Sequence, residues 1–137
     1  MKLGKLINAI AALIFVFSVA LIASPLTAVA APSSYQQTCS DISLRDNVLS
    51  AICRKRDQSP NQTAITLKGI ENIDGTLKVV DPQKTANFNL SCAGTSVAGA
   101  QISGQCRKMN GQFVQTATSI NGIENIDGVL KYTSSPS

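Results

Sequence analysis

Residues 69–75 read Gly-Ile-Glu-Asn-Ile-Asp-Gly, and the same seven residues return at positions 122–128. A constant offset extends this match without a gap over residues 35–79 and 88–132, where 18 of 45 aligned positions are identical. Two cysteines of the first stretch fall on two cysteines of the second. Agreement at one fixed offset over this length indicates a tandem duplication, so these residues form two copies of one structural unit.

Each copy carries the signal of a β-hairpin. The dipeptide Asp-Gly at 74–75 and again at 127–128 is typical of tight turns between antiparallel strands. The residues that follow these turns, 77–79 and 130–132, are predicted to be the return strands. Three further stretches show the apolar–polar alternation of half-buried strands: 48–53, 64–68 and 118–120. The sequence therefore predicts an all-β fold of short strands.

The apolar residues are too few for each repeat to fold by itself. A unit of this size cannot bury a sufficient core alone, so the two copies must pack on each other in one pseudo-symmetric domain. The polar segment 80–87, which contains Pro82, lies between the copies and is the natural hinge. Four aliphatic residues beside the turns are expected in the core: Ile73, Leu77, Ile126 and Leu130.

The first thirty residues have the three parts of a secretory signal peptide. Lys2 and Lys5 give a positive start, residues 6–23 are almost entirely apolar, and residues 28–30 offer small side chains to a signal peptidase. An uncleaved membrane anchor is the alternative, but Pro25 interrupts the apolar run. We expect cleavage after Ala30, which leaves residues 31–137 as a secreted domain, extracellular or periplasmic, with no membrane attachment.

Charge and composition exclude several classes of function. The chain has 12 Lys and Arg against 8 Asp and Glu, and its basic patches, 54–56 and 107–108, are too short for a nucleic-acid interface. It has no His, which removes the commonest general base and metal ligand. Acidic residues lie in and before the two Asp-Gly turns, where an Asp commonly binds backbone amides. We therefore expect no catalysis and no cofactor, and favour a binding module.

Four cysteines are available to cross-link this small domain. Export favours disulfides over free thiols, and four cysteines allow three pairings. Cys39 with Cys53 and Cys92 with Cys106 would each close a short loop within one repeat. The duplication alone does not exclude cross-repeat bonds, so the local pairing is a preference at this point.

Several of these stretches resemble one known family. The opening residues 35–39, the cysteine spacing, and the segments 70–78 and 123–132 are similar to the cyanovirin-N homology family, over about residues 34–132. The resemblance implies a single elongated all-β domain of two pseudo-symmetric halves that exchange strands between the repeats. It also implies one disulfide within each repeat.

The resemblance further implies a lectin that binds high-mannose glycans or glycoproteins through terminal α1,2-linked mannose, without metal, cofactor or catalysis. One site near the termini would use Gln37, Thr38, Asn125 and Asp127. A second site would use Glu71, Asn72, Asp74, Asn87, Ser91 and Arg107, with Lys108 adjacent. The Asn and Asp residues of the two turns are expected to hold the turn, to face the pocket, or both.

Four residues depart from the family pattern at these sites: Arg54, Arg56, Leu90 and Met109. They keep open an alternative, a structural or protein-interaction module of the cell envelope that retains the fold without sugar affinity. The hinge is also longer than in the family, which should relax the strain that promotes exchange of halves between chains. We expect mainly a monomer, with a domain-swapped dimer as the alternative.

Overall fold

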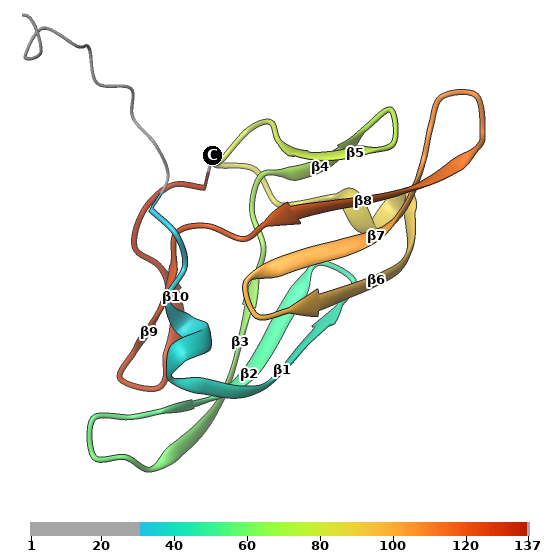
Figure 1. Ribbon diagram of the computed structural model, residues 1–137. Coiled ribbons are helices and arrows are strands. Elements are labelled where there is room, and N and C mark those ends of the chain that lie inside the picture. The colour runs from blue at the N-terminus through green and yellow to red at the C-terminus, as the bar shows by residue number, and fades with distance from the viewer. Residues whose placement is uncertain (1–30, 137) are drawn as a thin grey trace, which may run out of the picture.

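The structure, a computed structural model, describes residues 31–136 and consists almost entirely of short strands (Figure 1). The predicted signal peptide, residues 1–30, lies outside the described residues. The first repeat forms η2 (Tyr35–Gln37), β1 (Cys39–Arg45), β2 (Val48–Arg54), β3 (Pro60–Thr66), β4 (Ile70–Ile73) and β5 (Thr76–Val79). The second forms η3 (Phe88–Leu90), β6 (Cys92–Ala98), β7 (Gln101–Arg107), β8 (Phe113–Ser119), β9 (Ile123–Ile126) and β10 (Val129–Tyr132).

The two repeats have the same sheet topology. In each, three antiparallel strands form a meander, ordered β1-β2-β3 and β6-β7-β8, and a separate two-stranded hairpin follows, β4-β5 and β9-β10. The register pairs Cys39 with Cys53 and Cys92 with Cys106 on neighbouring strands. Both pairs form disulfides, so the pairing within each repeat is confirmed.

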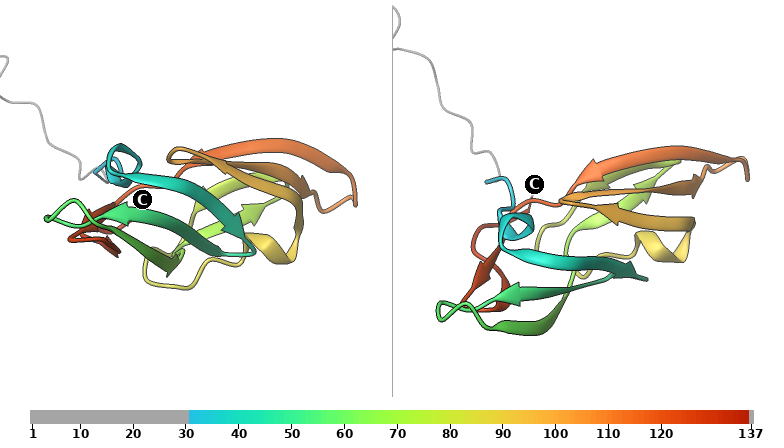
Figure 2. Two further views of the ribbon diagram at one scale, coloured as in Figure 1. Left: turned by 90° about the horizontal axis from the view of Figure 1, so that it is seen from below. Right: turned by 60° about the horizontal axis from the view of Figure 1, so that its bottom comes forward.

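The hairpins are exchanged between the repeats, as expected. Hairpin β9–β10 of the second repeat packs beside β3, and hairpin β4–β5 of the first repeat packs beside β8 (Figures 1 and 2). The Leu130 N–H donates to Thr63 Oγ1 at 3.2 Å, and the Leu77 N–H donates to the equivalent Thr116 Oγ1 at 3.1 Å. We call η2, β1–β3 and β9–β10 half A, and η3, β6–β8 and β4–β5 half B; they lie end to end in an elongated molecule.

Alternation along β2 builds the core of half A. Leu49, Ala51 and Cys53 are all buried, on the face that the alternation predicts. The hairpin turns also follow prediction, because the two turn residues at 74–75 and those at 127–128 all have positive φ. The sequence pattern therefore correctly locates the central strand and both tips.

One expectation about the core is wrong. Leu77 and Leu130 are 3% exposed, but Ile73 is 42% exposed and Ile126 is 37% exposed. Both isoleucines are the last residue of a four-residue strand, directly before the turn. Alternation along each strand puts these isoleucines on the face of Glu71 and Glu124, opposite the buried Ile70 and Ile123, so their side chains reach solvent.

Matching hydrogen bonds occur at two places: in the linker between the repeats, and where the two chain ends meet. The Gly69 N–H donates to the Lys84 carbonyl at 2.7 Å, and the equivalent Gly122 N–H donates to the Ala31 carbonyl at 2.8 Å. The Thr133 N–H in turn donates to the Gly122 carbonyl at 2.7 Å. The two ends of the described chain therefore meet beside Gly122, and residues 80–87 form the same arrangement within the chain.

Candidate functional site

Asn125 organises one end of half A. Its Nδ2 amide donates to Thr38 Oγ1 and to the Arg54 carbonyl, both at 2.9 Å. Its Oδ1 accepts from the Gly128 N–H at 2.7 Å. The Asn125 side chain on β9 thus links three segments: Thr38 after η2, the end of β2, and the turn between β9 and β10. Both amide hydrogens are used, so Asn125 holds the site together and retains only acceptor capacity for a ligand.

Asp127 stands at the tip of the same hairpin. Its Oδ1 accepts from the Arg56 N–H at 2.9 Å, and its other carboxylate oxygen has no hydrogen-bond partner in residues 31–136. Thr38 accepts from Asn125, which leaves its hydroxyl hydrogen free to donate. We call Thr38, Asn125, Asp127 and the backbone of Arg54 and Arg56 the half-A cradle.

Half B contains the same arrangement. The Asn72 amide donates to Ser91 Oγ and to the Arg107 carbonyl, both at 2.9 Å. Its Oδ1 accepts from the N–H of the turn glycine at 2.7 Å. The Met109 N–H donates to Asp74 Oδ1 at 2.8 Å. These residues form the half-B cradle, whose four hydrogen bonds match those of half A in partners and nearly in length.

The remaining predicted residues lie around the cradles without hydrogen-bonding into them. Gln37 is the exposed last residue of η2, directly before Thr38. Asn87 precedes η3, and its N–H donates to the Ile70 carbonyl at 3.2 Å. Glu71 neighbours Asn72 on β4, so its side chain leaves the opposite face of the strand. Among the described residues, the Glu71 carboxylate has no hydrogen bond or ion pair.

The half-A cradle opens into a hollow of about 250 Å³. Its lining consists of Thr38, Arg54, Lys55, Arg56, Asn125, Ile126 and Asp127. The sequence predictions named five of these as site residues or as departures from the family pattern, but gave no role to Lys55 and put Ile126 in the core. The basic run 54–56 is the sequence feature that could have identified Lys55, because the hydrogen bond from the Arg56 N–H to Asp127 holds this run beside the hollow.

The rims of the two cradles differ in chemistry. At the positions of Gln37 and Arg56 in half A, half B has Leu90 and Met109, which are 78% and 91% exposed. Phe113, opposite Arg107 in the register of β7 and β8, is also exposed. The backbone and the Asn–Asp pair are therefore retained in both halves. Three cations surround the cradle in half A, whereas in half B two cations, Arg107 and Lys108, stand beside exposed apolar side chains.

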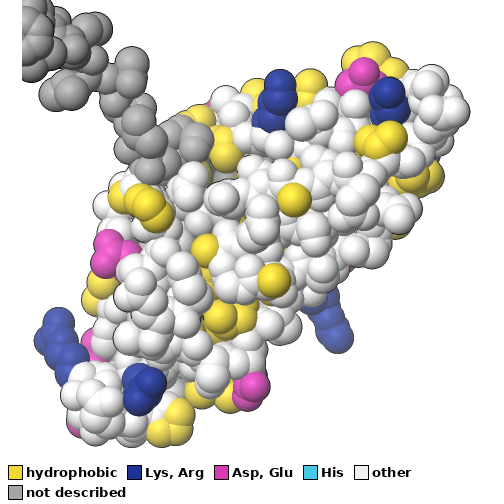
Figure 3. Space-filling model, in the orientation of Figure 1, with side chains coloured by type: hydrophobic (Ala, Val, Ile, Leu, Met, Phe, Trp, Pro, Cys, Tyr) yellow, Lys and Arg dark blue, Asp and Glu magenta, His cyan; other side chains and the backbone are white. Residues whose placement is uncertain are grey.

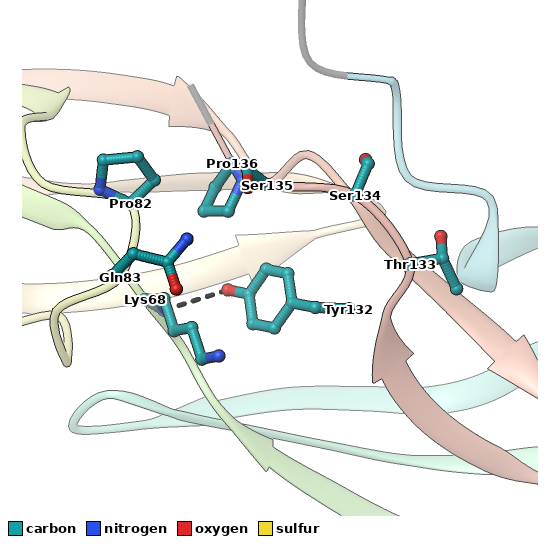
Figure 4. Close-up of a pocket in the computed structure, with 8 residues that line it drawn as sticks. All are labelled: Lys68, Pro82, Gln83, Tyr132, Thr133, Ser134, Ser135 and Pro136. Carbon is teal, nitrogen blue, oxygen red and sulfur yellow. Dashed lines mark hydrogen bonds between the residues drawn. The ribbon is translucent and has the colours of Figure 1, made fainter.

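Two other hollows lie away from the cradles. One, of about 190 Å³, lies where residues 82–83 meet the C-terminal segment (Figure 4). There the Lys68 N–H donates to the Tyr132 hydroxyl at 2.9 Å, and burial raises the pKa of that tyrosine. The other, of about 320 Å³, lies between the N-terminal segment and β7–β8. Neither contains a residue that the sequence predicted for a site.

Residues 31–136 contain no group of three or more His, Cys, Asp or Glu that could hold a metal ion. In the same residues, no helix is long and apolar enough to cross a membrane.

Comparison with known proteins relates this geometry to solved structures. A complex of microvirin with mannobiose is 27% identical, has a TM-score of 0.58, and aligns 74% of this chain with 98% of that one. A MoCVNH3 variant bound to a GlcNAc tetramer, (N-GlcNAc)4, is 16% identical with a TM-score of 0.63, over 77% of this chain and 99% of that one. The CVNH protein of T. borchii is 22% identical with a TM-score of 0.61, over 72% and 98%.

A comparison with curated proteins gives no match. The family comparison does: the CVNH domain matches residues 35–131, which is most of the chain and includes every strand of both halves except the last residue of β10. The expected resemblance is therefore confirmed, and the protein belongs to the CVNH family.

Proposed function

We propose that the protein is a carbohydrate-binding lectin without enzymatic activity, with one ligand site on each cradle. The observation that carries the proposal is the duplicated cradle itself. In both halves an Asn amide fixes the backbone, and an Asp keeps one carboxylate oxygen that no group of residues 31–136 binds, in the same cradle as a Thr or Ser hydroxyl. Membership of the CVNH family supports it, as do the solved relatives bound to mannobiose and to a GlcNAc oligomer.

The cradle groups suit a neutral, hydroxyl-rich ligand. The free carboxylate oxygen of Asp127 can accept from a sugar hydroxyl, and the Thr38 hydroxyl can donate to a neighbouring sugar oxygen. Because the Asn125 bonds hold both groups in place, little conformational entropy is lost on binding. For the finer specificity we propose high-mannose glycans with terminal α1,2-linked mannose, on oligosaccharides or glycoproteins.

Two cradles at different ends of one rigid body would strengthen binding to branched glycans. The second contact is made at the high effective concentration that the first contact creates, so two weak sites together bind tightly. We also propose that the protein acts outside the cytoplasm, as residues 31–137 after removal of the signal peptide. An intact mass of the exported protein that begins at Met1 would contradict this.

The test is calorimetric titration of residues 31–137 with oligomannose and, separately, with a GlcNAc oligomer. Asp127→Asn retains an oxygen for the Arg56 N–H but replaces the free carboxylate oxygen, and Asn tolerates the positive φ of this turn. We expect Asp127→Asn and Asp74→Asn each to weaken one site about tenfold, and the double variant to lose avidity. Asp46→Asn, also at a positive φ but in the β1–β2 turn, is the matched control.

One observation favours the alternative, a cell-envelope module that keeps the fold without binding sugar. The half-B rim exposes Leu90, Met109 and Phe113, side chains that suit contact with protein better than contact with sugar hydroxyls. Absence of binding to every oligosaccharide, in protein whose two disulfides are intact, would favour this alternative and reject the lectin.

A further inference from the structure

We infer that the half-A cradle selects glycans that carry an anionic substituent, and that the Arg56 side chain binds this substituent. This inference rests on the proposed lectin function and assigns a ligand class to one of its two sites. The shared chemistry is a negatively charged group, phosphate, carboxylate or sulfate, attached to a sugar that the cradle holds by its hydroxyls.

The first observation is the position of three consecutive cations. Arg54, Lys55 and Arg56 all line the half-A hollow and are all exposed. The hydrogen bonds of the Arg54 carbonyl and the Arg56 N–H fix the backbone on both sides of Lys55. The loop between β2 and β3 forms one end of the molecule, where Lys and Arg side chains protrude into solvent (Figures 1 and 3). All three cations therefore border the hollow beside the cradle.

The second observation is that little negative charge balances these cations: in the described part of the chain, only Lys55 has a charge interaction with a carboxylate, that of Asp57. Across residues 31–136, none of the three side chains makes an ion pair. The carboxylates nearby are Asp127, which binds the Arg56 N–H, and Asp57, whose Oδ1 accepts from both the N–H and the hydroxyl of Ser59. Three cations face two carboxylates, so an anion can bind here without displacing an internal ion pair.

The third observation comes from the other half of the same chain. Arg54 and Lys55 correspond to Arg107 and Lys108, but Arg56 corresponds to Met109. The backbone N–H of either residue makes the same bond to its turn aspartate, at 2.9 and 2.8 Å. The fold therefore needs the main chain at this position and leaves the side chain free to determine specificity.

Arginine suits this role because its planar guanidinium binds carboxylate or phosphate oxygens in pairs. The Arg56 side chain begins at the residue whose N–H binds Asp127, so it extends from the edge of the cradle. An anionic group on the sugar held in the half-A cradle, or on the next sugar, lies within reach of the Arg56 guanidinium. Methionine at the equivalent position of half B offers no charge.

The experiment compares neutral oligomannose with the same oligomannose carrying a mannose 6-phosphate, by calorimetry at low and at high salt. Uronic-acid and sulfated oligosaccharides are the further arms that identify the anion. We expect the phosphorylated ligand to bind at least about tenfold more tightly at low salt, and the advantage to shrink at high salt, where exposed charges are screened.

Three variants locate the effect. Arg56→Met, which copies the half-B residue, should remove the preference while neutral oligomannose still binds. Arg45→Met removes the same charge at the far end of β1 and should leave the preference intact. Met109→Arg should confer the preference on half B.

The outcomes separate this inference from the proposed function. Equal affinity for neutral and anionic ligands overturns the inference and leaves the lectin in place. A preference that survives Arg56→Met, or that Arg45→Met lowers equally, overturns the role of Arg56. Binding of no ligand at all rejects both the inference and the lectin.

Discussion

At the scale of single residues, Asn125 and Asn72 are more important for structure than the sequence suggests. Each amide donates twice and accepts once within the fold. We expect Asn125→Ala to lower the free energy of unfolding by about 2 to 3 kcal/mol, because it leaves the Arg54 carbonyl and the Gly128 N–H without partners. Urea denaturation measures this.

The matched control for that substitution is Asn89→Ala. The Asn89 side chain makes no hydrogen bond with the described residues, so its removal should change the unfolding free energy by less than about 0.5 kcal/mol. Equal losses for the two variants would show that the cradle bonds do not stabilise the fold.

Tyr35 gives a second residue-scale prediction, on pH. Its side chain is fully buried, its hydroxyl donates to the Gly99 carbonyl at 2.5 Å, and burial raises its pKa to about 12. The folded state therefore favours the neutral phenol. Stability is retained below pH 10, the ordinary pKa, and about 2 to 3 kcal/mol is lost as the pH rises to 12.

Tyr35→Phe, which copies Phe88 of the other repeat, tests this directly. We expect it to cost about 1 kcal/mol at neutral pH through the lost hydrogen bond, and to remove most of the alkaline loss. Thermal unfolding of both proteins between pH 9 and 12 measures the difference. The account of Tyr35 fails if both proteins lose stability in parallel.

Much of the site could be predicted at this scale, but not the partners of its residues. The resemblance to the cyanovirin-N homology family identified Asn72, Asp74, Asn125 and Asp127 as site residues, and the repeat places them at equivalent positions of the two halves. Their partners are backbone groups of Arg54, Arg56 and their equivalents, and a backbone N–H or carbonyl leaves no mark on the sequence. Ile73 and Ile126 were misplaced because alternation along the short strands puts them on the face of Glu71 and Glu124, opposite the buried Ile70 and Ile123.

At the scale of elements, the hairpin tips fit closely against the opposite repeat. Gly128 and Gly111 both have φ +89°, but a Cβ at Gly128 would lie 2.8 Å from Lys55 Cγ and 3.1 Å from Asn61 Cβ, whereas Gly111 has open space. Both substitutions to Ala carry the cost of positive φ, about 1 kcal/mol. We expect Gly128→Ala to cost at least 1 kcal/mol more.

Denaturant titration of the two Ala variants isolates the docking of the tip, because the backbone strain is common to both. Equal destabilisation would mean that hairpin β9–β10 does not pack as closely on half A as described.

Two of the strands that the sequence failed to predict, β1 and β6, share a cause. β1 and β6 each contain a break in register, at Ser40–Ser43 and Ala93–Ser96, with Asp41 and Gly94 at positive φ. A bulge shifts the inward and outward alternation by one residue, so the period-two pattern fails along the strand. β2 has no such break against β3 and was predicted over nearly its full length.

At the scale of the whole molecule, neither repeat is complete without the other. Each meander is covered by the hairpin of the other repeat, so we expect one cooperative unfolding transition for both halves. The exchange takes place within one chain, because backbone hydrogen bonds join residues 84–87 of the linker to residues 67–70. We therefore predict mainly monomer; a dominant dimer in sedimentation at low micromolar concentration would contradict this.

The central claim is that ligand binds at the two cradles, and an NMR titration of isotope-labelled protein with α1,2-mannobiose tests it most directly. We predict shifts at the amides of Arg56 and Met109, which bind the turn aspartates, and at Thr38 and Ser91, with Lys68 and Tyr132 unchanged. No shift at any concentration, or shifts confined to the hollow around Lys68 and Tyr132, would contradict the account.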